Sequence, residues 1–98
     1  MSWLDTCERL GWPVTDEGDG FYISQYSPAG EDFGFSIRKK NPKDEIMDYY
    51  QDFDVDEHVT MWINAKASGM SGVPTIKELV HDAEKIESML EELAVEVA

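Results

Sequence analysis

The sequence has a single cysteine, no long hydrophobic run and few basic residues. Cys7 has no second cysteine with which to form an internal disulfide, which is typical of proteins from a reducing compartment. No apolar stretch reaches the roughly 18 residues of a membrane-spanning helix, and acidic residues stand where a secretory signal would be basic and then apolar. The sequence therefore predicts a cytoplasmic protein that does not cross a membrane.

The scarcity of bases is matched by an excess of acids. Eight Lys and Arg residues stand against twenty-one Asp and Glu, which gives a formal net charge of −13 over 98 residues. A field of this sign repels nucleic acid and anionic membranes, and it accelerates encounter with basic surfaces. We therefore expect a basic protein as the partner, and neither direct nucleic-acid binding nor membrane binding. Solubility alone is the alternative explanation of the acidity.

The chain nevertheless contains enough apolar material to fold. Hydrophobic residues make up 42% of it, including three Trp, four Tyr and four Phe. Disorder is not expected at this content, and a chain of this length has room for one core, so residues 1–98 should form a single domain. Cys7 lies at helical spacing from Trp3 and Leu10, which predicts a small buried side chain rather than a nucleophile.

Turn residues separate three short segments that have the composition of strands. We expect strands at 12–14, 21–26 and 33–37, the last with alternating apolar and polar residues. In the first segment Pro13 cannot donate to a ladder, which predicts an edge strand. Because the connections are short, the three strands should form an antiparallel meander.

Apolar residues at helical spacing mark four further segments, with cap signals at Ser2, Asn41, Asp54 and Thr75. Gly11 should end the first helix in a left-handed conformation, and Pro42 suits the first position of the second. A flexible connector is expected at 67–72, and an apolar stripe from Ile76 to Val97 predicts a long last helix. The predicted fold class is α+β: a three-stranded antiparallel sheet with about four helices on one face, the last one long.

Part of the acidic sequence resembles a calcium loop. Asp52, Asp54 and Asp56 take the first, third and fifth positions, but the sixth is Glu57 instead of glycine and the twelfth is Ile63 instead of a bidentate glutamate. Helix capping explains these acids better, because carboxylates in a first turn meet the positive end of the helix dipole, at about 0.3–1 kcal/mol each. We expect no metal, no cofactor and no enzymatic activity, since no catalytic motif has the required spacing.

Capping does not explain the rest of the acidic residues. Residues 44–57 carry seven acids and no Lys or Arg, whereas helices built for stability alone usually pair Glu with Lys four residues apart. Residues 78–98 carry seven acids and one base. Rows of carboxylates are what a protein needs to imitate the phosphates of DNA. The residues that we expect to bind the partner are Asp44, Glu45, Asp48, Asp52, Asp54, Asp56, Glu57, Glu84, Glu87 and Glu91.

Two smaller features have alternative interpretations. The connection at 27–32 contains proline and glycine in the roles of a hairpin turn, while a functional interpretation makes Glu31 and Asp32 a contact point at the sheet edge. His58 lies on the apolar side of a predicted helix, which favours a partly buried core histidine over a ligand.

Three stretches of the chain are similar to a known group of proteins: YSPAGEDFGFSI (26–37), FDVDEHVTMWI (53–63) and GVPTIKELVHDAEKIESMLEELA (72–94). The group that they resemble consists of small, acidic, uncharacterised proteins of gut Firmicutes, often carried on phage-like or conjugative elements. Because the group has no established activity, the resemblance implies no site residues. It implies an anti-defence role, by analogy with acidic proteins of mobile elements that mimic DNA against restriction or CRISPR enzymes.

The predicted function is therefore a non-enzymatic acidic binding protein, a DNA-mimic inhibitor of a basic nucleic-acid-handling protein of host defence. The alternative is a small accessory protein or a homodimer, joined through apolar residues such as Met61, Trp62 and Met70, with the acidity serving solubility. Salt separates the two hypotheses, because an ionic interface weakens at high salt and an apolar one does not.

Overall fold

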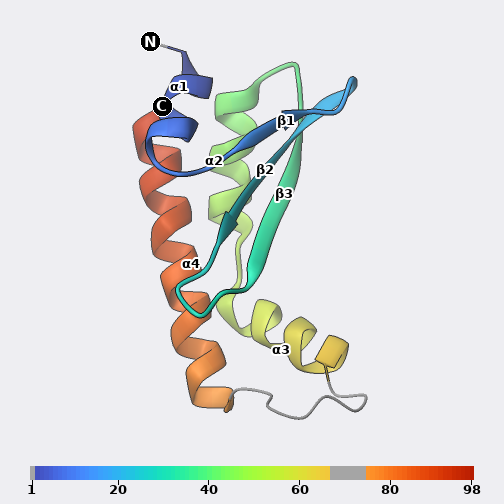
Figure 1. Cartoon of the computed structure of the whole chain (residues 1–98), viewed down its shortest axis with the longest axis vertical. Coiled ribbons are helices and arrows are strands. Elements are labelled where there is room, and N and C mark those ends of the chain that lie inside the picture. The colour runs from blue at the N-terminus through green and yellow to red at the C-terminus, as the bar shows by residue number, and fades with distance from the viewer. Residues whose placement is uncertain (1, 67–74) are drawn as a thin grey trace.

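The computed structural model describes residues 2–66 and 75–98. In chain order the elements of this part are α1 (Trp3–Arg9), β1 (Val14–Asp16), β2 (Gly20–Tyr26), β3 (Asp32–Arg38), α2 (Pro42–Asp52), α3 (Val55–Lys66) and α4 (Ile76–Val97). The strands form one antiparallel sheet in the order β1-β2-β3 (Figure 1). The predicted α+β class, with a three-stranded antiparallel sheet and a long last helix, is confirmed. The connector predicted at 67–72 lies outside the described residues.

Alternation along the strands places the core on one face of the sheet. Phe33, Phe35 and Ile37 are buried on this face, and Ile23 of β2 lies opposite Phe35. Helices α2 and α4 cover it, and the ring of Tyr49 on α2 stacks on Phe35 with 4.2 Å between centroids. The helices therefore lie on one side of the sheet, as the apolar stripes predicted.

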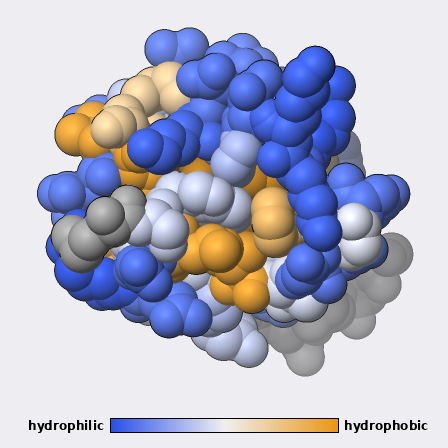
Figure 2. Space-filling model, turned by 90° about the horizontal axis from the view of Figure 1, so that it is seen from above, coloured by the Kyte–Doolittle hydropathy of each residue, from blue (hydrophilic) through white to orange (hydrophobic). Residues whose placement is uncertain are grey.

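Helix α1 closes one end of the core. It packs on the end of α4, where Cys7 and Val97 are both buried. In the view down the long axis from the end that carries both termini, hydrophilic side chains surround a hydrophobic centre (Figure 2). Burial raises the pKa of the Cys7 thiol to about 11, because the thiolate is poorly solvated there. The predicted burial of Cys7 is confirmed.

Three of the four predicted helix caps are confirmed by hydrogen bonds. The side chains of Ser2, Asp54 and Thr75 accept from backbone N–H groups three residues later. Asn41 is the N-cap residue of α2, as predicted, but its side chain makes no such bond. Its backbone, at φ −157° and ψ 67°, departs from the extended geometry that Ser2 and Thr75 adopt, and the following Pro42 restricts it further.

The start of β1 and the burial of Ile76 also differ from the prediction. Strand β1 begins at Val14, two residues later than expected, because the backbone N–H of Trp12 bonds to the Cys7 carbonyl at 2.7 Å and its ring is buried. Pro13 then accepts from Ser24, and pairing starts there. Ile76 was predicted in the buried stripe of α4 but is 65% exposed. It is the first residue of the helix, and burial of the stripe begins one turn later.

Candidate functional site

Three exposed aspartates form a row along α2. Asp44, Asp48 and Asp52 are separated by four residues each, so they lie on one face of the helix, with about 6 Å of rise between neighbours. No described Lys or Arg forms an ion pair with any of them. We call these three residues the acidic row.

Glu45 is adjacent in sequence but is used inside the protein. One carboxylate oxygen accepts from the backbone N–H of Arg38 at 3.3 Å and from its Nε at 2.6 Å. The side-chain bond to Arg38 is the main reason that the pKa of Glu45 is lowered, and it raises the pKa of Arg38 in return. Glu45 therefore links the start of α2 to the end of β3. Because Arg38 neutralises its carboxylate, Glu45 contributes less than the acidic row to the attraction of a basic partner.

The junction of α2 and α3 brings three of the predicted acids around one hollow. Asp52 ends α2, and Asp54 caps α3 by accepting from the N–H of Glu57 at 3.0 Å. The hollow has a volume of about 200 Å³. We call this space the junction hollow. It is lined by Tyr49, Asp52, Phe53, Asp54, Glu57, His58 and Met61. Asp56 is exposed on the first turn of α3, outside this lining.

The acids predicted on α4 lie apart from the acidic row. The Tyr50 hydroxyl of α2 donates to Glu91 at 2.7 Å, which raises the pKa of Tyr50, and Glu87 adds to this effect. Tyr50 is two residues from both Asp48 and Asp52, hence about 200° around the helix from them. The acidic row and Glu91, with Glu87 near it, thus lie on opposite sides of α2, whereas Glu84 lines a hollow beside the β2–β3 hairpin.

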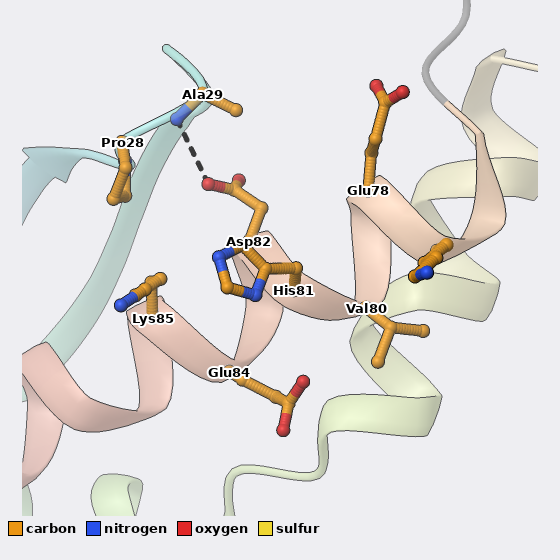
Figure 3. Close-up of a pocket in the computed structure, with 9 residues that line it drawn as sticks. Pro28, Ala29, Glu78, Val80, His81, Asp82, Glu84 and Lys85 are labelled. Carbon is orange, nitrogen blue, oxygen red and sulfur yellow. Dashed lines mark hydrogen bonds between the residues drawn. The ribbon is translucent and has the colours of Figure 1, made fainter.

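The β2–β3 hairpin is clamped by the two helices beside it. Asp82 of α4, only 7% exposed, accepts from the N–H of Ala29 at 3.0 Å (Figure 3). Glu31 contacts His58 of α3 at 3.1 Å, and both side chains are 18% exposed. Glu31 therefore serves the fold, which favours the turn interpretation for that residue. His58 is confirmed as a partly buried histidine, packed against Phe33.

A second hollow lies between this hairpin and α4, with a volume of about 920 Å³ (Figure 3). Three basic side chains line it at four-residue spacing, Lys77, His81 and Lys85, together with the acids Glu78, Asp82 and Glu84. This basic row was not predicted, although its spacing is visible in the sequence. Because the charges of the lining are mixed, the hollow does not select a ligand of either sign.

Strand β3 is one of the two edge strands of the sheet, and its outer edge has no neighbouring strand in the described part of the chain (Figure 1). The hairpin bond from Ser27 N–H to the Glu31 carbonyl sets the alternation of hydrogen-bonded pairs along β2 and β3. The residues whose N–H and C=O point away from β2 are consequently Asp32, Gly34 and Ser36. The bond from Arg38 N–H to Glu45 continues this outward series.

The outward N–H and C=O groups of Asp32, Gly34 and Ser36, which we call the open edge, have no hydrogen-bond partner among the described residues. Asp32 was a contact at the sheet edge in only one of the two interpretations of 27–32, and the backbone groups were not predicted. The signal was available, because a last strand without proline or lysine between 33 and 37 has nothing that protects its edge.

Two further findings concern metal ligands and membrane-spanning helices. No three His, Cys, Asp or Glu side chains in residues 2–66 and 75–98 are grouped as metal ligands would be. Among the helices of this same part, none has both the length and the apolar character needed to cross a membrane.

The chain matches no protein-family model, and comparison with curated proteins and with solved structures finds no match. Function is therefore inferred from the geometry of this chain alone.

Proposed function

We propose that this chain is a non-enzymatic binding protein whose acidic row engages a basic surface of a nucleic-acid-handling protein. The observation that carries the proposal is the row itself: three exposed carboxylates on one helix face, without an ion-pair partner in the described residues. The Lys and Arg residues that do form ion pairs are committed to other acids. These pairs are Arg9–Glu96, Arg38–Glu45 and Lys39–Asp16.

The row is unfavourable for the isolated helix. Like charges four residues apart destabilise a helix by about 0.2–0.5 kcal/mol for each pair, and Asp48 takes part in two such pairs. A basic partner removes this repulsion when it binds, so the free energy stored in the row contributes to association. The overall charge of −13 also accelerates encounter with a basic surface.

The spacing of the row defines what kind of mimicry it supports. One carboxylate per about 6 Å of helix is roughly half the linear charge of one DNA strand, which has a phosphate every 3.4 Å or so. Such a row can hold a line of Lys and Arg side chains that otherwise contact phosphates. It does not need to reproduce the whole duplex to compete for them.

The distribution of exposed apolar residues favours a charged interface over an apolar one. Met61, Ile76 and Val95 are each more than 60% exposed. Ile76 and Val95 are nineteen residues apart on α4, which is about 28 Å along the helix. These two described residues are therefore too far apart to belong to one docking patch, and single exposed apolar residues are normal on a surface.

The test is a pair of charge-reversed variants used as bait. Asp48→Lys with Asp52→Lys alters the row, and Glu8→Lys with Glu92→Lys is the matched control on exposed acids elsewhere. Each pair changes the net charge from −13 to −9. Immobilised proteins are incubated with bacterial lysate at low salt, and captured proteins are identified by mass spectrometry after elution with duplex DNA.

We expect wild type and control to retain nucleic-acid-handling proteins that both DNA and salt displace, and the row variant to lose them. Equal capture by the row variant and the control would overturn the assignment of the row. Capture that survives high salt would instead favour an apolar interface and a small accessory protein or homodimer.

A further inference from the structure

The open edge of β3 and the acidic row belong to one interaction surface. We propose that an extended basic segment of the partner adds to β3 as a fourth antiparallel strand, with Lys or Arg at every second position facing the acidic row. This inference rests on the proposed function, because it specifies how the basic partner is held. The binding mode is strand addition, in which backbone hydrogen bonds supply affinity and alternate side chains supply specificity.

Strand β3 has the features of an edge that accepts another strand. It is seven residues long, and no proline, lysine or bulge interrupts its pairing register with β2. The outward N–H and C=O groups of Asp32, Gly34 and Ser36 offer three donors and three acceptors. The opposite edge strand, β1, is only three residues long and follows Pro13, so it offers much less.

Helix α2 runs along β3 and brings the acidic row beside this edge. Near its start Glu45 bonds to Arg38, in its middle Tyr49 stacks on Phe35, and after its last turn Phe53 packs on the strand at its beginning. The row lies on the side of α2 away from Tyr50, whose hydroxyl bonds to α4. Since α4 lies on the other side of α2, the row faces outward beyond the edge of the sheet.

The spacing of side chains along an added strand matches the spacing of carboxylates along the acidic row. In an extended strand, every second side chain lies on the same face, about 6.6–6.8 Å apart. The carboxylates of the acidic row repeat every 6 Å or so along α2. A segment with basic residues at alternate positions can therefore place successive ammonium or guanidinium groups beside successive aspartates.

The junction hollow provides a site for one of these basic side chains. It lies beside the start of β3, because Phe53 and His58 from its lining both contact Phe33. Asp52, Asp54 and Glu57 supply carboxylates, and Tyr49 and Phe53 add aromatic rings to the lining. Helix α3 lies beyond this end of β3, which limits how far the added strand extends (Figure 1).

A second copy of this chain fits the edge poorly. Pairing two β3 edges would bring two acidic rows together between molecules that each carry a charge of −13. Like charges at such an interface oppose association, whereas a basic segment neutralises them. The charge of the surface therefore selects a basic partner and not self-association.

The backbone pattern yields a sharp test with a synthetic peptide. The probe has seven residues, the length of β3, with lysine at every second position and threonine or valine between. In antiparallel addition, the residues that bond to the open edge are those directly opposite Asp32, Gly34 and Ser36, and these are the positions between the lysines. The lysine N–H groups point away from β3.

N-methylation of the positions between the lysines should therefore weaken binding about tenfold or more, whereas N-methylation of the lysines should leave affinity within about threefold. Calorimetry at low salt measures both peptides against wild-type protein. Ser36→Pro removes one outward donor and should also weaken binding, while Ser36→Thr, which keeps it, should not. Circular dichroism checks that both variants are folded.

Each outcome separates the edge from the row. Loss of binding with Asp48→Lys and Asp52→Lys, but equal affinity of the two N-methylated peptides, would overturn strand addition and leave the proposed function standing. Peptide binding that is unchanged both in the row variant and at high salt would overturn strand addition and the proposed function together. A dimer whose mass falls to that of a monomer on Ser36→Pro would show that a second copy occupies the edge, and would overturn the choice of a basic partner.

Discussion

The most informative single substitution is Asp48→Asn, because it removes charge from the centre of the acidic row and changes little else. Asp48 is exposed, and its neighbours four residues away in each direction are Asp44 and Asp52. Two repulsive pairs disappear, which should stabilise the fold by about 0.4–1 kcal/mol at low ionic strength. Asp and Asn have similar helix propensities, so backbone effects nearly cancel. Binding to a basic partner should weaken at the same time.

Urea denaturation followed by circular dichroism measures this change. For a domain of this size it corresponds to an increase in Tm of about 2–8 °C. The screening length falls from roughly 30 Å at 0.01 M salt to 3 Å at 1 M, so a repulsion acting over about 6 Å should largely vanish at high salt. Asp19→Asn, an exposed turn residue with the same change of charge, is the control and should have a smaller effect.

Three results would refute this reasoning. A loss of stability at low salt would mean that Asp48 makes a favourable contact within the protein. A gain that is independent of salt would mean that its cause is not electrostatic. An equal gain for Asp19→Asn would mean that overall charge, and not the row, sets the repulsion.

The remaining predictions concern the rest of the fold. Asp82→Ala leaves the N–H of Ala29 without its acceptor and should cost about 0.5–1.5 kcal/mol in urea denaturation, whereas Asp82→Asn should cost clearly less; equal costs would contradict the clamp. The Cys7 thiol, buried with a pKa of about 11, should react with a thiol reagent only as the protein opens, so rapid labelling without urea would contradict its burial. Arg38 lowers the pKa of Glu45, so this pair stabilises the fold fully at pH values above 4.5, the ordinary pKa of the carboxyl group, and less as the pH falls below it. Wild type and Glu45→Gln should therefore differ in Tm near neutral pH and converge in acid.

The sequence predicted the fold from patterns that depend on near neighbours. Alternation identified β2 and β3, and helical spacing together with cap residues located α3 and α4. The failures occurred where a tertiary contact overrides a local preference. Trp12 enters the core instead of starting β1, because the end of α1 and the sheet aromatics hold it there.

The candidate site was only partly predictable. The spacing of Asp44, Asp48 and Asp52 is visible in the sequence, so their row could be expected. That Glu45 is bound to Arg38, and that Glu91 lies across α2 from the row, depends on how α2 packs between β3 and α4. The sequence shows that the last strand lacks edge protection, but which of its backbone groups point outward depends on the pairing register, which composition does not reveal.

The most direct measurement is residue-resolved amide hydrogen exchange with and without the alternating-lysine peptide. In the free protein the amides of Asp32, Gly34 and Ser36 should exchange rapidly, while that of Phe35, which bonds to β2, should be protected. Saturating peptide should slow the three outward amides and leave β1 unchanged. If the peptide binds but all three amides exchange as fast as before, the proposal that the open edge and the acidic row form one binding surface is contradicted.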